Sequence, residues 1–353
     1  MPDTAPIRIA VVGCGSIAQV MHIPYLAELP QFELAALCDL SPSVLERLGK
    51  KYGVRRLTVD YTEVLDEVDA VAVLTHEHAA VAIAAAELGR HVFVEKPLSF
   101  SPKACDQILG ATRENGVKLM VGYMRRFDPG FLWALDRVAE LEPIRFVRLH
   151  DFGGTFAVHP QIYTLYRDEQ ATADGGGWID DDVKQSMLGA LGSGHEHLLD
   201  VYHEMLMSGS HDLAVLRGIL GPPEAVLHSE RLGSAGMLSM LAYGNGCRCL
   251  YEGALMTEYP WWDQTVSLYG DAGVVSIDFS SPFVRNAPTV VTVRRSDGDA
   301  PLSTTTPVSY DEAFRREWLH FAECVRHDRE PLTNGEDARA DVELALAMVH
   351  AIA

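Results

Sequence analysis

A glycine-rich turn near the N-terminus has the spacing of a dinucleotide-binding loop. Residues 13–18 read Gly-Cys-Gly-Ser-Ile-Ala, and they directly follow the β-branched segment Ile7–Val12. In such a loop the first glycine makes the turn, the second lets the backbone approach a pyrophosphate, and the third small residue allows close helix packing. A generic glycine-rich loop could show the same letters, but the position between an expected strand and an expected helix favours a dinucleotide. The predicted contacts are Gly13, Gly15, Ser16 and Ile17.

An acidic residue at the end of the next expected strand bears on the choice of dinucleotide. Asp39 follows the segment Phe32–Cys38. Its carboxylate can accept hydrogen bonds from the adenosine ribose hydroxyls, and its charge would repel a 2′-phosphate. NAD is therefore predicted. NADP stays open because Arg55 or Arg56 could fold back, and Asp39 could instead only begin the cap of the following helix.

A lysine follows another segment that is expected to be a buried strand. Glu95-Lys96-Pro97 follows the expected strand His91–Val94. Ligands of open α/β sheets collect at the carboxyl ends of the strands, so Lys96 is expected there, although a lone lysine is usually a solvated surface charge. The predicted cofactor contacts at this edge of the sheet are Thr75, Glu95, Lys96 and Pro97.

Strands and helices alternate through the first third of the chain. Besides those named, strands are expected over 70–74 and 118–121, and helices over 41–48, 79–88 and 103–115. This alternation is typical of a parallel, doubly wound sheet. One hydrophobic core rarely exceeds roughly 250 to 300 residues, and the chain has 353, so two domains are expected. Residues 1–124 are predicted to form an NAD(P)-binding Rossmann domain of the α/β class.

The pattern changes after about residue 125. Segments rich in β-formers, with short glycine turns, lie at 146–151, 225–231, 238–242, 247–254, 265–269 and 289–294. Helices are expected over 181–191, 196–207, 212–220, 311–327 and 337–352. These segments predict an antiparallel or mixed sheet, and hence an α+β substrate-binding and oligomerisation domain over 125–353.

Composition excludes several kinds of partner and site. The formal net charge of −20 argues against nucleic acid and against an anionic membrane surface, because both need basic patches. A neutral small molecule fits better. The six cysteines form neither a disulfide framework nor a paired-cysteine zinc site. The N-terminus does not read as a secretory signal, and no apolar run approaches the ~20 residues of a membrane span. We therefore expect the chain in the cytoplasm.

The stretch 91–99, His-Val-Phe-Val-Glu-Lys-Pro-Leu-Ser, resembles the hallmark of the glucose-fructose oxidoreductase and inositol dehydrogenase family, written Gfo/Idh/MocA. The resemblance covers nearly the whole chain, through segments at 122–129, 209–213, 318–321 and 331–337. It implies a C-terminal domain with an open, mostly antiparallel sheet that often serves dimer or tetramer contacts. It also implies reversible oxidation of a secondary alcohol on a sugar, a cyclitol or a related compound.

The same resemblance assigns proton transfer to two side chains. Lys96 would touch the nicotinamide ribose and the substrate hydroxyl, and Pro97 would fix its direction. His211 matches the family's catalytic histidine, and its reference pKa of about 6.5 suits a general base; a helix-start residue that binds backbone is the alternative. Met207 departs from the family, which commonly has aspartate there. Either the chemistry differs, the activity is weak, or a neighbour substitutes, namely Glu204, His203 or Asp200.

Segment 155–206 is longer than this family usually needs before its histidine. It contains an aspartate run at 180–182 and a cluster of possible metal ligands, His195, Glu196, His197 and His203. Their spacing does not place all of them on one helical face, so no metal site is predicted. The insertion is expected to reshape the substrate pocket or an oligomer contact.

Aromatic and basic side chains complete the predicted substrate site. Trp261 and Trp262 could stack on a sugar ring, or could equally pack in a sheet or a subunit interface. Arg126, Tyr163 and Tyr166 could reach the pocket or line its rim. The predicted substrate contacts are Lys96, Arg125, His211, Trp261 and Trp262.

The sequence thus predicts an NAD(P)-dependent oxidoreductase that transfers a hydride to or from a secondary alcohol on a sugar, an inositol or other cyclitol, or an amino sugar. It is expected to be a homo-oligomer. One alternative is an enzyme that keeps NAD tightly bound for transient oxidation, as glycosidases or epimerases do. Another is a non-catalytic regulator that responds to NAD and sugar. Spacing does not encode the substrate's identity, the direction in the cell or the oligomeric state.

Overall fold

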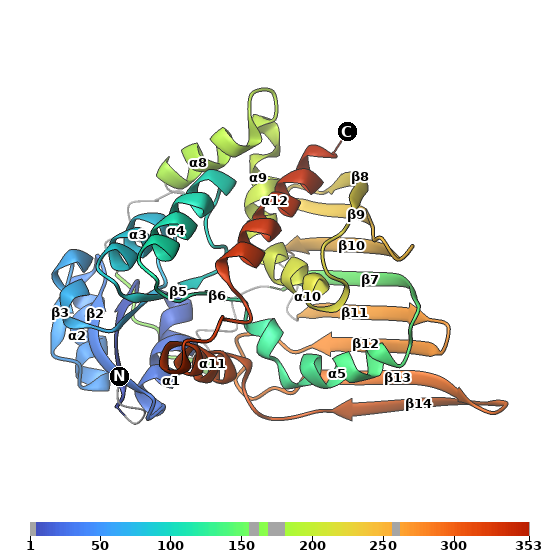
Figure 1. The fold of residues 1–353 in the computed structure, drawn as a ribbon, viewed down its shortest axis with the longest axis horizontal. Coiled ribbons are helices and arrows are strands. Elements are labelled where there is room, and N and C mark those ends of the chain that lie inside the picture. Colours follow the sequence, from blue (N-terminus) through green and yellow to red (C-terminus); the bar gives the residue numbers. More distant parts are fainter. Residues whose placement is uncertain (1–4, 155–161, 169–180, 256–261, 353) are drawn as a thin grey trace. The chain divides into compact units, whose positions relative to one another are not determined.

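The structure, a computed structural model, describes residues 5–154, 162–168, 181–255 and 262–352 (Figure 1). The chain divides into two compact units. Unit 1 comprises residues 1–122, 160–190 and 317–342, and unit 2 comprises residues 123–159, 191–316 and 343–353. Both units are discontinuous in sequence, so a single domain boundary at 124/125 stays a prediction.

Unit 1 is built on a six-stranded sheet in the order β3-β2-β1-β4-β5-β6. All five strand pairs are parallel. The strands are β1 (Ile7–Val12), β2 (Phe32–Cys38), β3 (Arg56–Thr58), β4 (Ala70–Val73), β5 (His91–Glu95) and β6 (Leu119–Gly122). Its helices include η1 (Ala18–His22), α1 (Ile23–Glu28), α2 (Pro42–Tyr52), η2 (Tyr61–Glu63), η3 (Leu65–Glu67), α3 (Ala79–Glu87), α4 (Pro102–Glu114) and α8 (Asp181–Leu191). The division between the units falls within α11 (Ala313–His327) and α12 (Gly335–His350).

The central strands of this sheet are apolar on both faces, as expected where helices cover both sides. Every residue of β4 is buried, and only Arg8 of β1 is exposed. Local signals begin and end α2: the Ser41 hydroxyl accepts from the N–H of Val44, Pro42 occupies the first turn, and Gly53 ends the helix at φ 75°. Because all the strands run parallel, their carboxyl ends, and the loops that follow them, lie at one edge of the sheet.

Unit 2 is built on an eight-stranded sheet in the order β14-β13-β12-β11-β7-β10-β9-β8. Only β7 and β10 pair in parallel; the other neighbours are antiparallel. The strands are β7 (Ile144–Gly153), β8 (Ala225–Leu232), β9 (Gly236–Ala242), β10 (Arg248–Leu255), β11 (Asp263–Gly270), β12 (Gly273–Phe279), β13 (Val290–Asp297) and β14 (Ala300–Pro307). This mostly antiparallel sheet confirms the predicted fold class.

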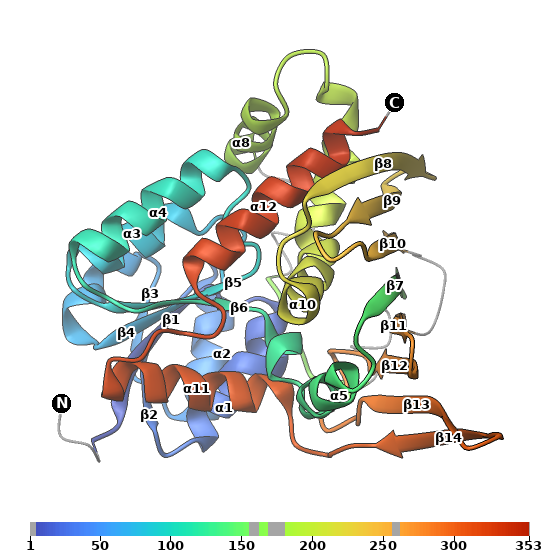
Figure 2. The same cartoon turned by 45° about the vertical axis from the view of Figure 1, so that its right-hand side comes forward.

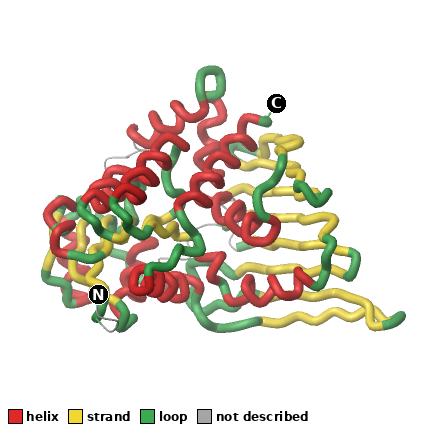
Figure 3. The backbone as a smooth tube through the Cα atoms, viewed as in Figure 1, coloured by secondary structure: helices red, strands yellow, loops and turns green. Residues whose placement is uncertain are grey.

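Helices of unit 2 lie on one face of that sheet. They are η4 (Met124–Phe127), α5 (Pro129–Ala139), η6 (Glu196–Leu198), α9 (Leu199–Glu204), η7 (Met205–Gly209) and α10 (Ser210–Leu220). Figures 1 and 2 show α5 and α10 on the same face, and Figure 3 shows the strands side by side beyond them. The sheet is therefore open on its other face as far as the described residues extend.

No helix of the described residues is long and apolar enough to cross a membrane. This finding covers only the ranges given above.

Candidate functional site

Steric crowding explains why the glycine-rich turn after β1 needs glycine at its first position. Gly13 has φ 93°, in the region that favours glycine, and a Cβ there would lie 2.6 Å from the carbonyl carbon and oxygen of Leu74. A Cβ on Gly15, by contrast, would meet no atom of the described residues within 4 Å. Gly15 is thus open on the side where a Cβ would point. That open space is what the close approach of a pyrophosphate needs.

The chain enters a helix directly after this turn. Ser16 and Ile17 are its first residues, and neither is buried. Backbone N–H groups at a helix start lack intrahelical partners and favour negative charge. The loop therefore suits the phosphates of a dinucleotide.

Asp39 ties the end of β2 to the glycine-rich turn. One carboxylate oxygen accepts from the N–H of Cys14 at 2.7 Å, and the other accepts from the N–H of Ser41 at 2.9 Å. A carboxylate oxygen has two acceptor positions, so each can still take a ribose hydroxyl. The N-cap of α2 is Ser41 rather than Asp39.

Lys96 follows a buried, hydrogen-bonded chain of side chains at the end of β5. The Glu95 carboxylate accepts from the N–H of Lys96 at 2.9 Å and lies 2.8 Å from Nε2 of His22. Trp318 donates from Nε1 to Nδ1 of His22 at 3.2 Å, so the imidazole must carry its proton on Nε2 and donate to Glu95. Burial opposes ionisation of Glu95, but the hydrogen bond from His22 and the Lys96 charge outweigh it and lower its pKa.

A second imidazole joins the ends of β4 and β5. The buried ring of His78 lies 2.8 Å from the carbonyl oxygens of both Thr75 and Pro97. Burial lowers its pKa despite the nearby charge of Glu77, which favours a neutral ring that donates to one carbonyl at a time. The structure thus brings Thr75, Glu95, Lys96 and Pro97 to one edge of unit 1, and the Lys96–Pro97 peptide is cis.

In unit 2, His211 is the second residue of α10. Its ring makes an edge-to-face contact with Tyr123, with the centroids 6.2 Å apart. The π-helical turn η7 directly precedes α10 and contains Met207. Of the three residues considered as substitutes for the family's aspartate, Asp200 is exposed, whereas Glu204 and His203 are half-buried.

Two buried acids lie beside the start of α10. Gln264 donates to Asp212 Oδ1 at 2.7 Å, and the Asp151 and Asp212 carboxyls hydrogen-bond to each other. Burial raises the pKa of Asp151 to about 6, against the opposing charge of Arg125, and burial and the charge of Asp151 raise that of Asp212. The geometry fits one proton shared between the two carboxyls.

The predicted substrate contacts have different surroundings. Trp262 is half-buried and donates from Nε1 to Oε1 of Gln264 at 3.2 Å, which links it to Asp212. Trp261 lies outside the described residues. Arg125 is only 3% exposed, donates to the carbonyl of Ser280 at 2.8 Å, and lies 4.8 Å from the ring centroid of Phe279.

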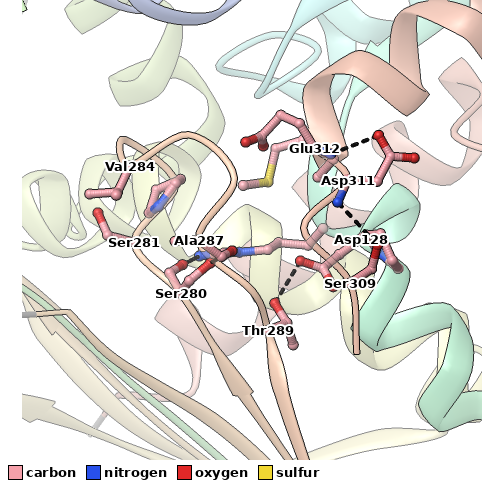
Figure 4. Close-up of a pocket in the computed structure, with 14 residues that line it drawn as sticks. Asp128, Ser280, Ser281, Val284, Ala287, Thr289, Ser309, Asp311 and Glu312 are labelled. Atoms are coloured by element: carbon pink, nitrogen blue, oxygen red, sulfur yellow. Dashed lines mark hydrogen bonds between the residues drawn. The ribbon is translucent and has the colours of Figure 1, made fainter. Parts of the chain in front are cut away.

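Arg125 is one of the residues that line a small cavity, which Figure 4 shows in close-up. Asp128, which accepts from Thr289 at 2.6 Å, and Glu312 also line it. Its interior offers about 10 Å³ to the centre of a water molecule, enough for a water and too little for a sugar. These surroundings do not test whether Arg125 contacts a substrate, so the Arg125–substrate contact stays a prediction.

No group of three or more His, Cys, Asp or Glu side chains in the described part of the chain is arranged to hold a metal ion. His195 instead packs against His350, with ring centroids 4.8 Å apart. The aspartate at 180 lies outside the described residues. Sequence reasoning did not place four neighbours of the site, namely Gln19, His22, His78 and Trp318. Gln19 binds Tyr166 and Trp318 binds His22 over 147 and 296 residues, whereas His78 binds the nearer Thr75 and Pro97.

Two family models match this chain. Residues 7–123 match the model described as "Oxidoreductase family, NAD-binding Rossmann fold", and residues 147–353 match "Oxidoreductase family, C-terminal alpha/beta domain". The chain belongs to the Gfo/Idh/MocA family of oxidoreductases. This confirms the predicted family, and with it an NAD(P) cofactor bound by the Rossmann fold of unit 1.

Several Gfo/Idh/MocA relatives match over almost their full length. Inositol 2-dehydrogenase of Rhizobium meliloti is 25% identical over 98% of this chain and 97% of the relative. The scyllo-inositol 2-dehydrogenase (NAD(+)) of Bacillus subtilis is also 25% identical, over 97% and 92%. Aldose-aldose oxidoreductase of Caulobacter crescentus has the same fold, with a TM-score of 0.75 and 23% identity over 98% of this chain and 97% of that structure.

Proposed function

We propose that this chain is an NAD-preferring dehydrogenase or ketoreductase that acts on a secondary alcohol of a sugar, an inositol or other cyclitol, or an amino sugar. Two relatives that match almost the whole chain are named as inositol dehydrogenases. The observation that carries the proposal is the fixed position of Lys96, whose N–H is held by the ionised, buried Glu95. Removing a hydride from an alcohol carbon requires that the hydroxyl proton leave too.

The residues divide this chemistry between them. Bound NAD(P) would accept or donate the hydride. Lys96 would orient the substrate hydroxyl and help to relay its proton to the general base, while Glu95 and His22 hold the Lys96 main chain in place. His211 is the proposed general base, and Trp262 the proposed stacking surface for a ring. The site assignments rest on the family resemblance and on the geometry within each unit.

Asp39 supports NAD over NADP. Its two oxygens already accept from Cys14 and Ser41, which fixes the carboxylate beside the turn and leaves acceptor positions for two hydroxyls. A 2′-phosphate in that place would meet a negative charge instead.

The decisive experiment replaces Lys96 by alanine and measures both turnover and NADH binding. We expect turnover on the best substrate of a polyol, sugar and aminocyclitol panel to fall about 100-fold or more, with NADH affinity still measurable. Lys103→Ala, on the exposed surface of α4, is the matched control. Retention of the rate in Lys96→Ala would contradict the role of Lys96.

Met207 keeps a second candidate open, a sugar-responsive NAD-binding regulator without catalysis. The Met207 side chain, four residues before His211, has no group that could orient an imidazole or accept a proton. Failure of every panel substrate to change the nicotinamide absorbance, together with sugar-dependent binding of a partner, would favour this candidate over the dehydrogenase.

We also propose a homo-oligomer that uses the open face of the unit 2 sheet. That face carries an ion-pair network in which Arg148 and His150 both bind Glu252 at 2.9 Å. A dimer or tetramer by light scattering would support this. A cytoplasmic location is part of the same proposal, supported by six buried cysteines that form no disulfide.

A further inference from the structure

A buried amide joins the glycine-rich turn to a distant segment of unit 1. Gln19 lies in η1 and is only 7% exposed. Its Nε2 donates to the carbonyl of Cys14 at 2.8 Å and to the carbonyl of Tyr166 at 2.8 Å. Its Oε1 accepts from the N–H of Tyr166, also at 2.8 Å. The side-chain amide therefore pairs with both polar groups of the Tyr166 residue, as a neighbouring strand could.

This arrangement uses the whole hydrogen-bonding capacity of the Gln19 NH2 group. One hydrogen fixes the turn at Cys14, between the two glycines that the dinucleotide needs, and the other fixes Tyr166. Glutamine has the length and the paired donor and acceptor for both contacts; alanine or leucine has neither. Loss of the amide would leave buried carbonyl groups without donors.

A second contact joins the same segment to helix α2. The Tyr166 ring lies 5.9 Å from the guanidinium carbon of Arg47. Arg47 is on α2, the helix that begins just after Asp39. Tyr166 is thus tied to the two elements that flank the proposed dinucleotide, the glycine-rich turn and the helix after the ribose-binding aspartate.

We propose that residues 162–168 form a strap of the dinucleotide site, anchored by Gln19 through Tyr166, and that this strap slows release of the bound nucleotide. The inference rests on the proposed function only in taking NAD(H) as the ligand of the turn. It gives part of the long segment before His211 a specific task. With the strap in place the nucleotide must wait for local opening before it leaves.

The strap is tested by the rate at which NADH leaves a preformed complex, followed by stopped-flow fluorescence after a chase with excess NAD. In Gln19→Ala we expect dissociation to speed up about tenfold or more, with a small change in the association rate. Gln107→Ala makes the same change on the exposed surface of α4 and should leave release unchanged. Thermal melting of each apo variant reports whether it folds.

Tyr166→Ala is the second variant, because it keeps the main-chain bonds to Gln19 but removes the ring from Arg47. It should speed release by a smaller factor, and it decides the question by the same rate if Gln19→Ala does not fold. Release within twofold of wild type in the folded variants overturns the strap while leaving the proposed function intact. Absence of NADH binding in the wild-type protein overturns the proposed function itself.

Discussion

Alanine at the two glycines of the dinucleotide turn should have opposite consequences. In Gly13→Ala the new Cβ would lie 2.6 Å from two backbone atoms of Leu74 and 2.7 Å from the backbone nitrogen of Thr75. Backbone cannot rotate away as a flexible side chain can. The same substitution at Gly15 adds a methyl group that meets nothing within 4 Å, at a residue whose φ is not positive.

The magnitudes follow from these two environments. A residue with a Cβ in a left-handed conformation costs about 1–2 kcal/mol, and overpacking costs about 1–3 kcal/mol more. Gly13→Ala should therefore lower the free energy of unfolding of unit 1 by roughly 2–5 kcal/mol, which lowers Tm by roughly 4–20 °C for a unit of this size. Gly15→Ala should leave stability unchanged or raise it by about 0.4–1 kcal/mol, because alanine has fewer unfolded conformations.

Gly15→Ala, which should not destabilise the fold, should instead weaken the binding of NADH. The open side of Gly15 is where a pyrophosphate would approach, so a methyl group there should weaken NADH binding about tenfold or more, or about 1.4 kcal/mol. Calorimetric melting of the apo proteins measures the first effect, and a fluorescence titration with NADH measures the second. Wild-type NADH affinity in Gly15→Ala would refute the assignment of the pyrophosphate site, and an unchanged Tm in Gly13→Ala would refute the steric argument.

Three further predictions concern acidic side chains. Asp39→Asn should raise the ratio of NADP to NAD affinity about tenfold, since it removes the charge that repels a 2′-phosphate but keeps the shape; paired titrations check this. Because the pKa of Asp151 is raised to about 6, the folded state binds its proton more tightly than the unfolded state, so stability falls as pH rises from about 4 to about 6. Asp151→Asn should flatten that fall in Tm. Burial and the charge of Glu95 raise the pKa of Glu317, whose carboxyl has no hydrogen-bond partner among the described residues, so Glu317→Gln should melt at a higher temperature than wild type at pH 8. A lower Tm would mean that the ionised carboxylate is stabilising.

The Rossmann half of the fold was predictable because its signals are local. Strands β1 and β2 have the predicted bounds, since continuous burial leaves a run of apolar residues between turn formers. Helix α5 was missed, although a signal was present: Asp128 caps it by accepting from the N–H groups of Gly130 and Phe131, and Pro129 fills the first turn.

The missed strands of unit 2 show where sequence rules end. Strand β14 is polar and almost wholly exposed, and it exists because each of its eight residues pairs with β13. A sheet edge of this kind has no hydrophobic pattern to detect. Strand β12 follows β11 after a two-residue turn, with Gly270 opposite Gly273, so its register comes from the pairing.

The residues of the candidate site also fall into two groups, those that the sequence predicts and those that only the fold reveals. Gly13, Gly15 and Asp39 follow from turn geometry and from a fixed offset along the chain. Gln19 and His22 do not, because Gln19 binds a residue 147 positions away and Trp318 binds His22 from 296 positions away. Only the folded chain reveals that a glutamine of η1 contacts Tyr166 and that a histidine of η1 contacts the glutamate beside Lys96.

The surroundings of Met207 limit what the four-residue offset from His211 can predict. Counting back from His211 assumes an α-helix, but η7 interposes a π-helical turn over Met205–Gly209. A π turn takes in an extra residue, so an offset of four residues does not equal one helical turn at this point. The choice among Glu204, His203 and Asp200 as the substitute for the family's aspartate therefore stays a prediction that the offset from His211 does not decide.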